Sequence, residues 1–331
     1  MKPTRTACVI ACLAAAAVVV HAQAPIKILT FAPESSIWSK VLREMAEGWK
    51  TRSKGRITYR LLPGGGESEE KLLRNLRLGQ SQVAQLSAIA LSNMDDAFNV
   101  FSLPMFFESF EEADAVLDKL SPILEARLEK QNLKILNWGY VGWIHIFSTQ
   151  PFTTVDELKK LPLYTSAGDE RFPAWYRRNG FNPKPFDASA MLSALTTGQI
   201  KAVPITPLSA QIFTWNKYAP YMLDVGFAPF IGATVMQIDR WKTFSADDQR
   251  IILEEAKKAG DRMRTEVPRL DKEAVATMQT SGLKVTTGDR KEWRQAGEKF
   301  GAAMRADLVP ADIYDLALKE RDALRKTKGT K

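Results

Sequence analysis

Few residues of this 331-residue chain have side chains suited to covalent or metal chemistry. Both cysteines, Cys8 and Cys12, lie near the N-terminus, and His145 is the only histidine after residue 22. A zinc site or a histidine-based triad therefore has almost no ligands or bases to use. A hydrolase would have to combine His145 with Ser148 or Ser166, although a single histidine in an apolar strand is usually structural. We expect no enzymatic activity, no cofactor and no bound metal.

The first 22 residues have the features of a secretory signal peptide. Lys2 and Arg5 precede an apolar run over residues 7–20, and Val20-His21-Ala22 supplies the residues before a cleavage site. Cleavage after Ala22 would leave a mature chain without cysteine, and so without a disulfide. A retained membrane anchor fits less well because the run is shorter than about 18 residues. A lipoprotein site at Cys12 fits less well because the apolar segment before it is too short. We expect export, with no membrane insertion after cleavage.

The net charge of +8 does not form a basic patch in the sequence. Lysines and arginines are interspersed with acids, as where Lys257 and Lys258 follow Glu254 and Glu255. This pattern is typical of solvated helix faces and does not favour nucleic-acid binding.

The order of apolar and polar segments predicts an α/β fold with two lobes. Residues 161–207 alternate short apolar strands with helices, which predicts a parallel sheet with a ligand crevice at its strand ends. Strands at 26–31 and 56–62, joined by a helix at 37–52, predict a second such unit. A helix at 245–280 would extend about 50 Å, although Pro268 should kink or break it.

Other segments set the expected connections and boundaries. We predict a buried strand at 83–91, helices on either side of Pro122, a long strand at 138–147 crossing between lobes, and helices at 291–326 interrupted near Pro310. The expected first lobe comprises residues 23–146 and about 230–265. The second comprises residues 147–229 and about 266–325, and residues 326–331 form a frayed tail.

Several motifs, in their order and spacing, resemble the DctP-type periplasmic solute-binding proteins of TRAP transporters. They are Ala32-Pro33, Gly64–Glu67, Leu78-Gly79, the aromatic loop from Phe101 to Phe107, Asp156-Glu157-Leu158-Lys159, Leu195-Thr196-Thr197-Gly198, Trp241 and the segment from Phe244 to Gln249. The resemblance covers nearly the whole mature chain. It implies a periplasmic-binding-protein-like fold: two α/β lobes with a cleft between them and a long helix spanning both. It also implies a periplasmic protein that closes around a small organic solute and delivers it to TRAP membrane permease subunits. A similar protein could instead present the solute to a membrane sensor.

This sequence departs from the family at the positions that usually bind a solute carboxylate. Tyr164 occupies the place of an arginine, Ile144 follows Gly142-Trp143 where a second arginine is common, and Thr206 replaces an asparagine. The resemblance therefore implies that the usual anion clamp is missing, so that the solute is not a simple dicarboxylate. Arg171 could supply a replacement charge, or the pocket could be neutral and aromatic; we favour the second.

The candidate ligand-binding residues follow from these arguments. Six are aromatic, and the others are glycine-loop, hydroxyl or charged residues near the predicted strand ends. They are Trp38, Gly66, Glu67, Ser87, Phe106, Tyr140, Trp143, Tyr164, Ser166, Arg171, Thr206 and Phe213.

Overall fold

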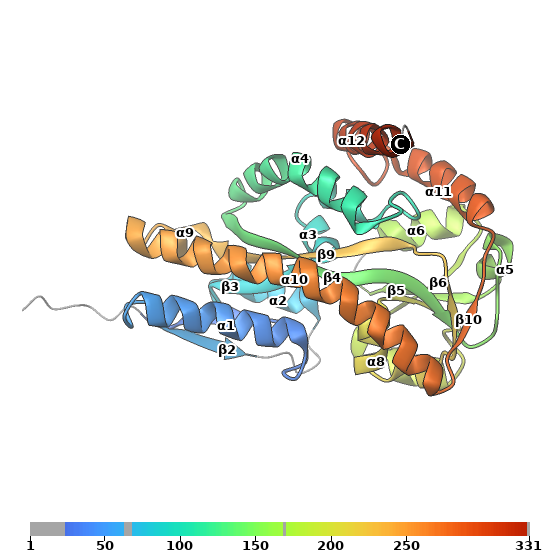
Figure 1. Cartoon of the computed structure of the whole chain (residues 1–331), viewed down its shortest axis with the longest axis horizontal. Helices are drawn as coiled ribbons and strands as arrows, with labels where there is room; N and C mark the ends of the chain where they lie inside the picture. Colours follow the sequence, from blue (N-terminus) through green and yellow to red (C-terminus); the bar gives the residue numbers. More distant parts are fainter. Residues whose placement is uncertain (1–23, 63–67, 168–169, 330–331) are drawn as a thin grey trace, which may run out of the picture.

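The computed structural model of this chain describes residues 24–62, 68–167 and 170–329. The predicted signal peptide at residues 1–22 lies outside these ranges, as do Gly66 and Glu67. Figure 1 shows an elongated molecule in which two long strands pass from one half to the other, with helices packed around them. Within the described ranges, no helix is both long and apolar enough to cross a membrane.

The half that contains the start of the described chain, here the first lobe, is built on a mixed sheet. Three parallel strands lie in the order β2 (Tyr59–Leu62), β1 (Ile26–Leu29) and β3 (Val83–Ser87). Antiparallel β9 (Ala228–Gln237) pairs with β3 and with β4 (Leu133–Ser148). The carboxyl ends of β1, β2 and β3 therefore lie at one edge, where a ligand crevice forms in such sheets.

The second lobe uses the far end of β4. Strands β7 (Ala202–Ile205) and β8 (Tyr221–Leu223) pair with it. Strand β5 (Pro162–Ser166) lies between β7 and β6 (Asn182–Phe186) in parallel register, and β10 (Lys284–Thr286) pairs with β8. The predicted alternation of strands and helices is confirmed, since α6 (Arg171–Arg178) and α7 (Met191–Thr196) connect these strands. The shorter helices are α5 (Val155–Lys159), η2 (Ala188–Ala190), α8 (Pro207–Ile212), η3 (Trp215–Lys217) and α9 (Ile238–Trp241).

Two predictions in the first lobe are wrong in detail. The apolar run at 83–91 is not one strand, because the Ser87 hydroxyl accepts a hydrogen bond from the Ala90 N–H at 3.1 Å and caps α3 (Ala88–Ser92). Pro122 does not separate two helices but lies inside α4 (Phe110–Glu129), where its missing N–H removes only one bond of the ladder. Helices α1 (Ile37–Arg52), α2 (Glu69–Arg77) and η1 (Asp96–Ser102) complete this lobe.

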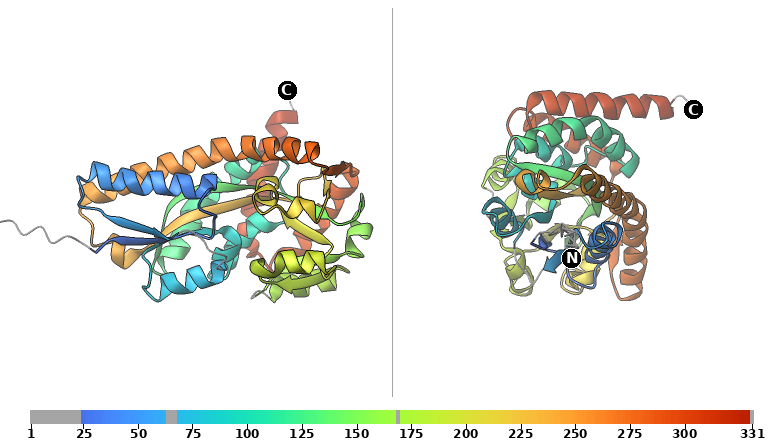
Figure 2. Two further views of the ribbon diagram at one scale, coloured as in Figure 1. Left: turned by 90° about the horizontal axis from the view of Figure 1, so that it is seen from below. Right: turned by 90° about the vertical axis from the view of Figure 1, so that its left-hand side faces the viewer.

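Helix α10 (Ala246–Thr280) connects the two lobes, and it continues through Pro268. Figures 1 and 2 show it lying beside α1 at one end and reaching α8 at the other. The approach to β4 is close: a Cβ added at Gly260 would lie 2.6 Å from the Trp138 carbonyl oxygen. The Trp49 indole N–H, on α1, donates to the Ile252 carbonyl at 3.2 Å. The expected long helix spanning both lobes is present.

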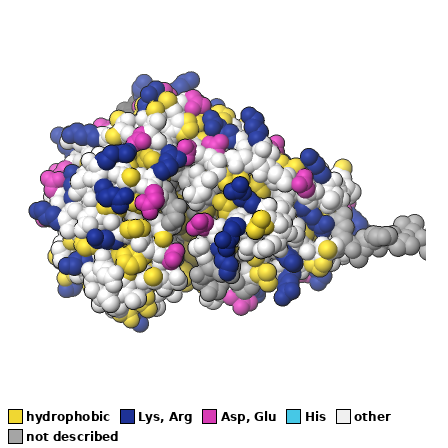
Figure 3. All heavy atoms as spheres, turned by 180° about the vertical axis from the view of Figure 1, so that it is seen from behind, with side chains coloured by type: hydrophobic (Ala, Val, Ile, Leu, Met, Phe, Trp, Pro, Cys, Tyr) yellow, Lys and Arg dark blue, Asp and Glu magenta, His cyan; other side chains and the backbone are white. Residues whose placement is uncertain are grey.

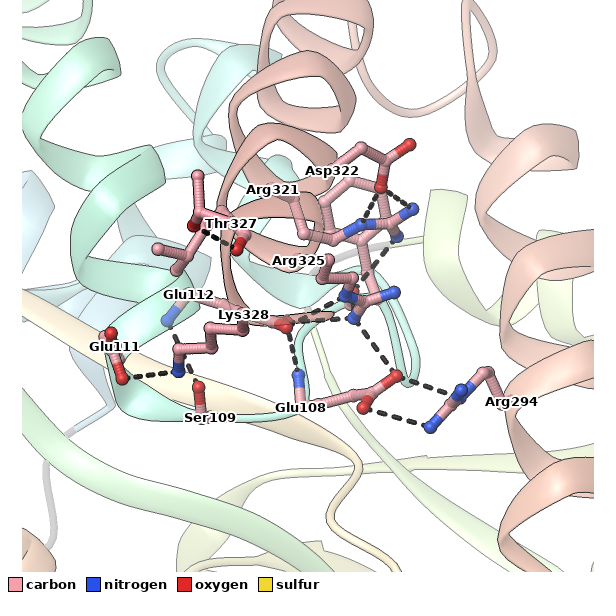
Figure 4. A network of polar contacts seen from close by, with 12 residues as sticks. Glu108, Ser109, Glu111, Glu112, Arg294, Arg321, Asp322, Arg325, Thr327 and Lys328 are labelled. Carbon is pink, nitrogen blue, oxygen red and sulfur yellow. Dashed lines mark hydrogen bonds and ion pairs between the residues drawn. The ribbon is translucent and has the colours of Figure 1, made fainter. Parts of the chain in front are cut away.

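The C-terminal helices differ from the predicted boundaries. Helix α11 (Arg290–Met304) contacts the second lobe through Trp293, whose indole N–H donates to the Thr153 carbonyl at 2.8 Å. Helix α12 (Ala311–Gly329) packs on α4 of the first lobe, although we assigned residues 266–325 to the second. The physical reason is a network of charged side chains between α12 and the start of α4 (Figure 4). The helix also continues to Gly329, past the predicted frayed end at Lys326.

Replacing Arg325 should show that the buried ion pair of this network contributes more to stability than the exposed one. Arg325 donates to both carboxylate oxygens of the buried Glu112, at 2.8 and 2.9 Å. The change Arg325→Ala leaves that carboxylate without its cation, so we expect a loss of about 2–3 kcal/mol in chemical denaturation. In the control Lys328→Ala, an exposed pair with Glu111 is lost and the expected cost is below about 1 kcal/mol. Equal effects of the two changes would contradict this assignment.

Candidate functional site

The candidate site lies between the lobes, at the carboxyl ends of β3 and β5. Ser87 ends β3 of the first lobe, and Ser166 ends β5 of the second. Two residues before Ser166, the Tyr164 phenol lies near enough to Glu69 of the first lobe to be influenced by its charge. Figure 3 shows a groove between the two halves, with Asp and Glu as well as Lys and Arg side chains beside it. Charged groups of both signs therefore border the groove.

Glu69 is the first residue of α2, and it reaches back to the end of β3. Its Oε1 accepts the Ser87 backbone N–H at 2.5 Å, and its Oε2 accepts the Ser87 hydroxyl at 2.7 Å. Burial raises the pKa of this carboxyl to about 7, because the two bonds from Ser87 offset only part of the lost hydration. Our sequence reasoning missed Glu69. An acid in the first turn after the Ser68 cap is normally explained by the helix dipole alone.

The second-lobe side of the gap carries Tyr164, Ser166 and Asp187. Burial raises the pKa of Tyr164 to about 12; the Asp187 and Glu69 carboxylates also raise it, and a hydrogen bond with Ser166 lowers it. Ser166 is exposed, and its hydroxyl donates to the Ala167 carbonyl at 3.3 Å. The charged groups that act on Tyr164 are thus acids, so this part of the gap is electrostatically unfavourable for a solute carboxylate.

A separate outer cavity of about 520 Å³ is lined by residues of both lobes. It is lined by residues that follow β3 in the chain and by residues that follow β5. The first group is residues 92–96 and Asn99, and the second is Glu170, Arg171 and Phe172; Arg127 and Pro310 complete the lining. Asn99 is buried, and its side-chain oxygen has no hydrogen-bond partner among the described residues. The cavity therefore offers a polar space that residues of both lobes line.

Arg171 bridges the lobes at this outer cavity. Its guanidinium pairs with Asp96 of the first lobe and donates to the Asp307 carbonyl at 3.1 Å. Arg178, at the other end of α6, pairs with the Asp307 carboxylate at 2.5 Å. We considered that Arg171 could replace the missing clamp. In this structure its side chain already binds Asp96 and Asp307, and binding of a solute by Arg171 stays a prediction.

The six predicted aromatic residues do not form one pocket. Trp38 and Tyr140 are core residues: the Trp38 indole N–H donates to the Tyr140 carbonyl at 3.2 Å, and the Tyr140 hydroxyl donates to Asp114 at 2.8 Å. Burial raises the pKa of Tyr140 well above its ordinary value. Phe106 is buried beneath α12, with the Arg321 guanidinium 4.2 Å from its ring centre. These three side chains are buried, and Trp38 and Tyr140 line one small cavity that Phe106 does not reach.

The remaining predicted residues have separate surroundings. Trp143 packs edge-to-face on Phe110 with ring centres 4.9 Å apart, and Phe213 stacks on Trp215 at 5.1 Å. Thr206 is fully buried and caps α8, accepting the Ser209 N–H at 3.3 Å. Of the predicted set that the structure describes, Tyr164 is hydrogen-bonded with Ser166, and Ser87 is linked to them through Glu69, which it binds and whose charge acts on Tyr164. Arg171 lines the outer cavity.

His145 and its serine candidates do not form a catalytic arrangement. The His145 Nδ1 lies 3.0 Å from the Leu223 carbonyl oxygen, and burial lowers the pKa of the imidazole. The Ser148 hydroxyl donates to the Gln150 carbonyl at 2.7 Å, and Ser166 donates to Ala167. The two serine hydroxyls thus have backbone partners instead of the imidazole, and this geometry gives no support to a hydrolase.

The chain is similar to bacterial solute-binding proteins in sequence. Residues 28–306 match the family model described as bacterial extracellular solute-binding protein, family 7, or DctP. An uncharacterized protein of Haemophilus influenzae is 26% identical over 193 residues, a match that spans only 57% of that relative and 57% of this chain. The sialic acid-binding periplasmic protein SiaP of Vibrio cholerae is 21% identical over 289 residues, covering 85% of this chain and 88% of SiaP.

The solved structures extend this likeness to the fold. A TRAP periplasmic solute-binding protein from Xanthobacter autotrophicus, with bound beta-D-galacturonate, matches with a TM-score of 0.82 at 17% identity. The match covers 90% of this chain and 99% of that one. At this identity it shows a shared two-lobed fold.

Proposed function

This chain belongs to family 7 of the bacterial extracellular solute-binding proteins, and from this premise we propose that it captures a small organic solute between its lobes and delivers it to a TRAP-type membrane permease. The observation that carries the proposal is the gap where Glu69 and Ser87 of one lobe face Tyr164 of the other. Sites at the carboxyl ends of strands, between two lobes joined by few connections, are suited to closure around a small molecule.

Location and chemistry agree with this role. The predicted signal peptide would export the chain to the periplasm, where a permease in the inner membrane can receive the solute. The hydroxyl and carboxyl groups in the gap hold and orient a ligand, and the described residues supply no activated nucleophile beside a base. We therefore propose a binding protein without catalytic activity.

Solute binding should stabilise the mature protein by mass action. A solute at about 100 times its Kd adds about 2.7 kcal/mol, so we expect Tm to rise by about 5 °C or more. The measurement is thermal unfolding of the mature protein with sialic acid, galacturonate, and neutral and amine-bearing compounds of similar size. Native mass spectrometry of the same samples gives the stoichiometry, which we expect to be one solute per chain. If no compound changes either readout, solute capture is not the function of this gap.

A further inference from the structure

The Glu69 carboxylate, in the gap, has hydrogen-bond acceptor positions that its partners do not use. Each oxygen of Glu69 accepts one hydrogen bond from Ser87, at 2.5 Å to the backbone N–H and 2.7 Å to the hydroxyl. A carboxylate has about four acceptor positions, so two remain unused by these bonds. Ser87 is itself fixed, because it is fully buried and caps α3 through the Ala90 N–H at 3.1 Å. The carboxylate is therefore held rigidly with spare acceptor capacity.

Within the described ranges, no cation is among the groups that act on Glu69. The influences on this side chain are its burial and the two hydrogen bonds from Ser87, and its pKa is raised to about 7. Most buried carboxylates of proteins are paired with Arg or Lys, because an uncompensated charge is costly away from water. The positive charge that would complete this site is therefore absent from the groups that surround it in the described structure.

The opposite wall adds acceptors and negative charge. Tyr164 stands across the gap within the field of both Glu69 and Asp187, and its phenol, with a pKa of about 12, stays neutral near pH 7. A solute carboxylate placed between these groups would meet two acids of like charge, whereas a cationic donor would be attracted by both. Arg171 follows Tyr164 by seven residues and lines the outer cavity. It is paired with Asp96 and hydrogen-bonded to the Asp307 carbonyl.

We propose that Glu69 and Ser87 form a subsite for a protonated amine, so that the natural solute is a small organic molecule carrying an ammonium group. The ammonium donates to the free acceptor positions of Glu69, and the Tyr164 ring and hydroxyl cover it from the second lobe when the lobes close. This inference rests on the proposed function and narrows it to one class of solute. The interaction draws on a charge-assisted hydrogen bond and on the field of Asp187.

The test compares matched solutes on the mature protein and two variants. The probes are galactosamine, galactose and galacturonate, with amine, neutral and carboxylate forms of short aliphatic and aromatic scaffolds beside them. Glu69→Gln removes the charge but keeps the shape, because the amide oxygen can accept the Ser87 N–H and the amide N–H₂ can donate to the Ser87 hydroxyl. Glu70→Gln is the matched control, since Glu70 is the next residue of the same helix and is exposed.

We expect amine-bearing probes alone to bind with appreciable affinity in calorimetry. Glu69→Gln should weaken them about tenfold to a hundredfold, the effect of one hydrogen bond to a charged group, while Glu70→Gln should change them by less than about twofold. Tm of both unliganded variants should stay at or above that of the wild type, which separates lost binding from lost folding.

Two results would overturn the inference. If carboxylate or neutral probes bind as well as amines, or if amine binding is insensitive to Glu69→Gln, the protein is a solute-binding protein without this subsite. If no probe of any charge binds the wild type, the proposed function is overturned and this inference with it. The two failures are distinguishable because the first retains a saturable solute and the second has none.

Discussion

Replacing Gly142 by alanine should destabilise the protein by about 3–5 kcal/mol, which is large for a change of one methyl group. Gly142 has a φ of +146° and lies where the register of β4 against β9 shifts between Tyr140 and Gly142. A Cβ there would be 2.5 Å from Asp271 Oδ2 and 2.7 Å from Thr206 Cβ. The cost combines backbone strain of about 1–3 kcal/mol with overpacking of similar size. Chemical denaturation of Gly142→Ala measures it.

A second glycine separates the two contributions. Gly282 has a φ of +103°, but a Cβ there would have no neighbour within 4 Å. Gly282→Ala should therefore show the backbone strain alone, about 1–2 kcal/mol. If the two variants lose equal stability, crowding at Gly142 contributes nothing and our account of this position is wrong.

The crowding matters because Gly142 lies at the crossing between lobes. Asp271 of α10 accepts the Trp143 N–H of β4 at 2.7 Å with one oxygen and the Leu208 N–H of α8 at 2.9 Å with the other. One buried carboxylate thus connects the lobe-spanning helix, the crossing strand and a helix of the second lobe. Space for this carboxylate exists only because residue 142 has no side chain. The local backbone and the relative position of the lobes are therefore set together.

Local chemistry explains why much of the fold could be predicted from the sequence. Ser36 and Ser245 each cap a helix that the sequence predicts, with bonds from the Ser39 N–H at 3.2 Å and the Asp248 N–H at 3.1 Å. These signals operate over three residues, so the sequence contains them directly. The wrong predictions at Ser87 and Pro122 arose where one residue type is compatible with two local structures. Packing of the surrounding chain decides between them.

The candidate site was less predictable because its contacts are distant in sequence. Arg171 and Asp96 are 75 residues apart, and Asp271 is 128 residues from Trp143. Trp38 and Tyr140 show a second limit: an aromatic residue in an apolar segment has the same pattern whether it fills the core or lines a pocket. Tyr164 was proposed because the resemblance places it where an arginine is common, and Ser166 because strand ends in a parallel sheet are a general location for ligands.

The unliganded protein should lose stability as the pH rises from about 4 to above 7, opposite to the usual behaviour of paired acids. Burial raises the pKa of Glu69 from 4.5 to about 7 and that of Asp271 from 3.8 to about 7. The folded state therefore holds protons that the unfolded state has already released, and stability falls with pH across this window. The loss is at most about 3–4 kcal/mol for each group. Thermal unfolding between pH 5 and about pH 8 measures it.

His145 opposes this trend and must be removed to see it. Its buried imidazole has a lowered pKa, so the unfolded state takes up the proton first and His145 makes stability rise with pH up to about 6.5. In a His145→Gln background we expect a steady fall in Tm with pH. Adding Glu69→Gln or Asp271→Asn should each remove part of it, because neither amide titrates. Surface acids with lowered pKa values, such as Glu157 and Asp315, titrate below this window. A pH profile unchanged by both amide substitutions would show that these two carboxyls are ionised in the folded protein as they are in water, and that the gap and the crossing strand are more hydrated than their burial indicates.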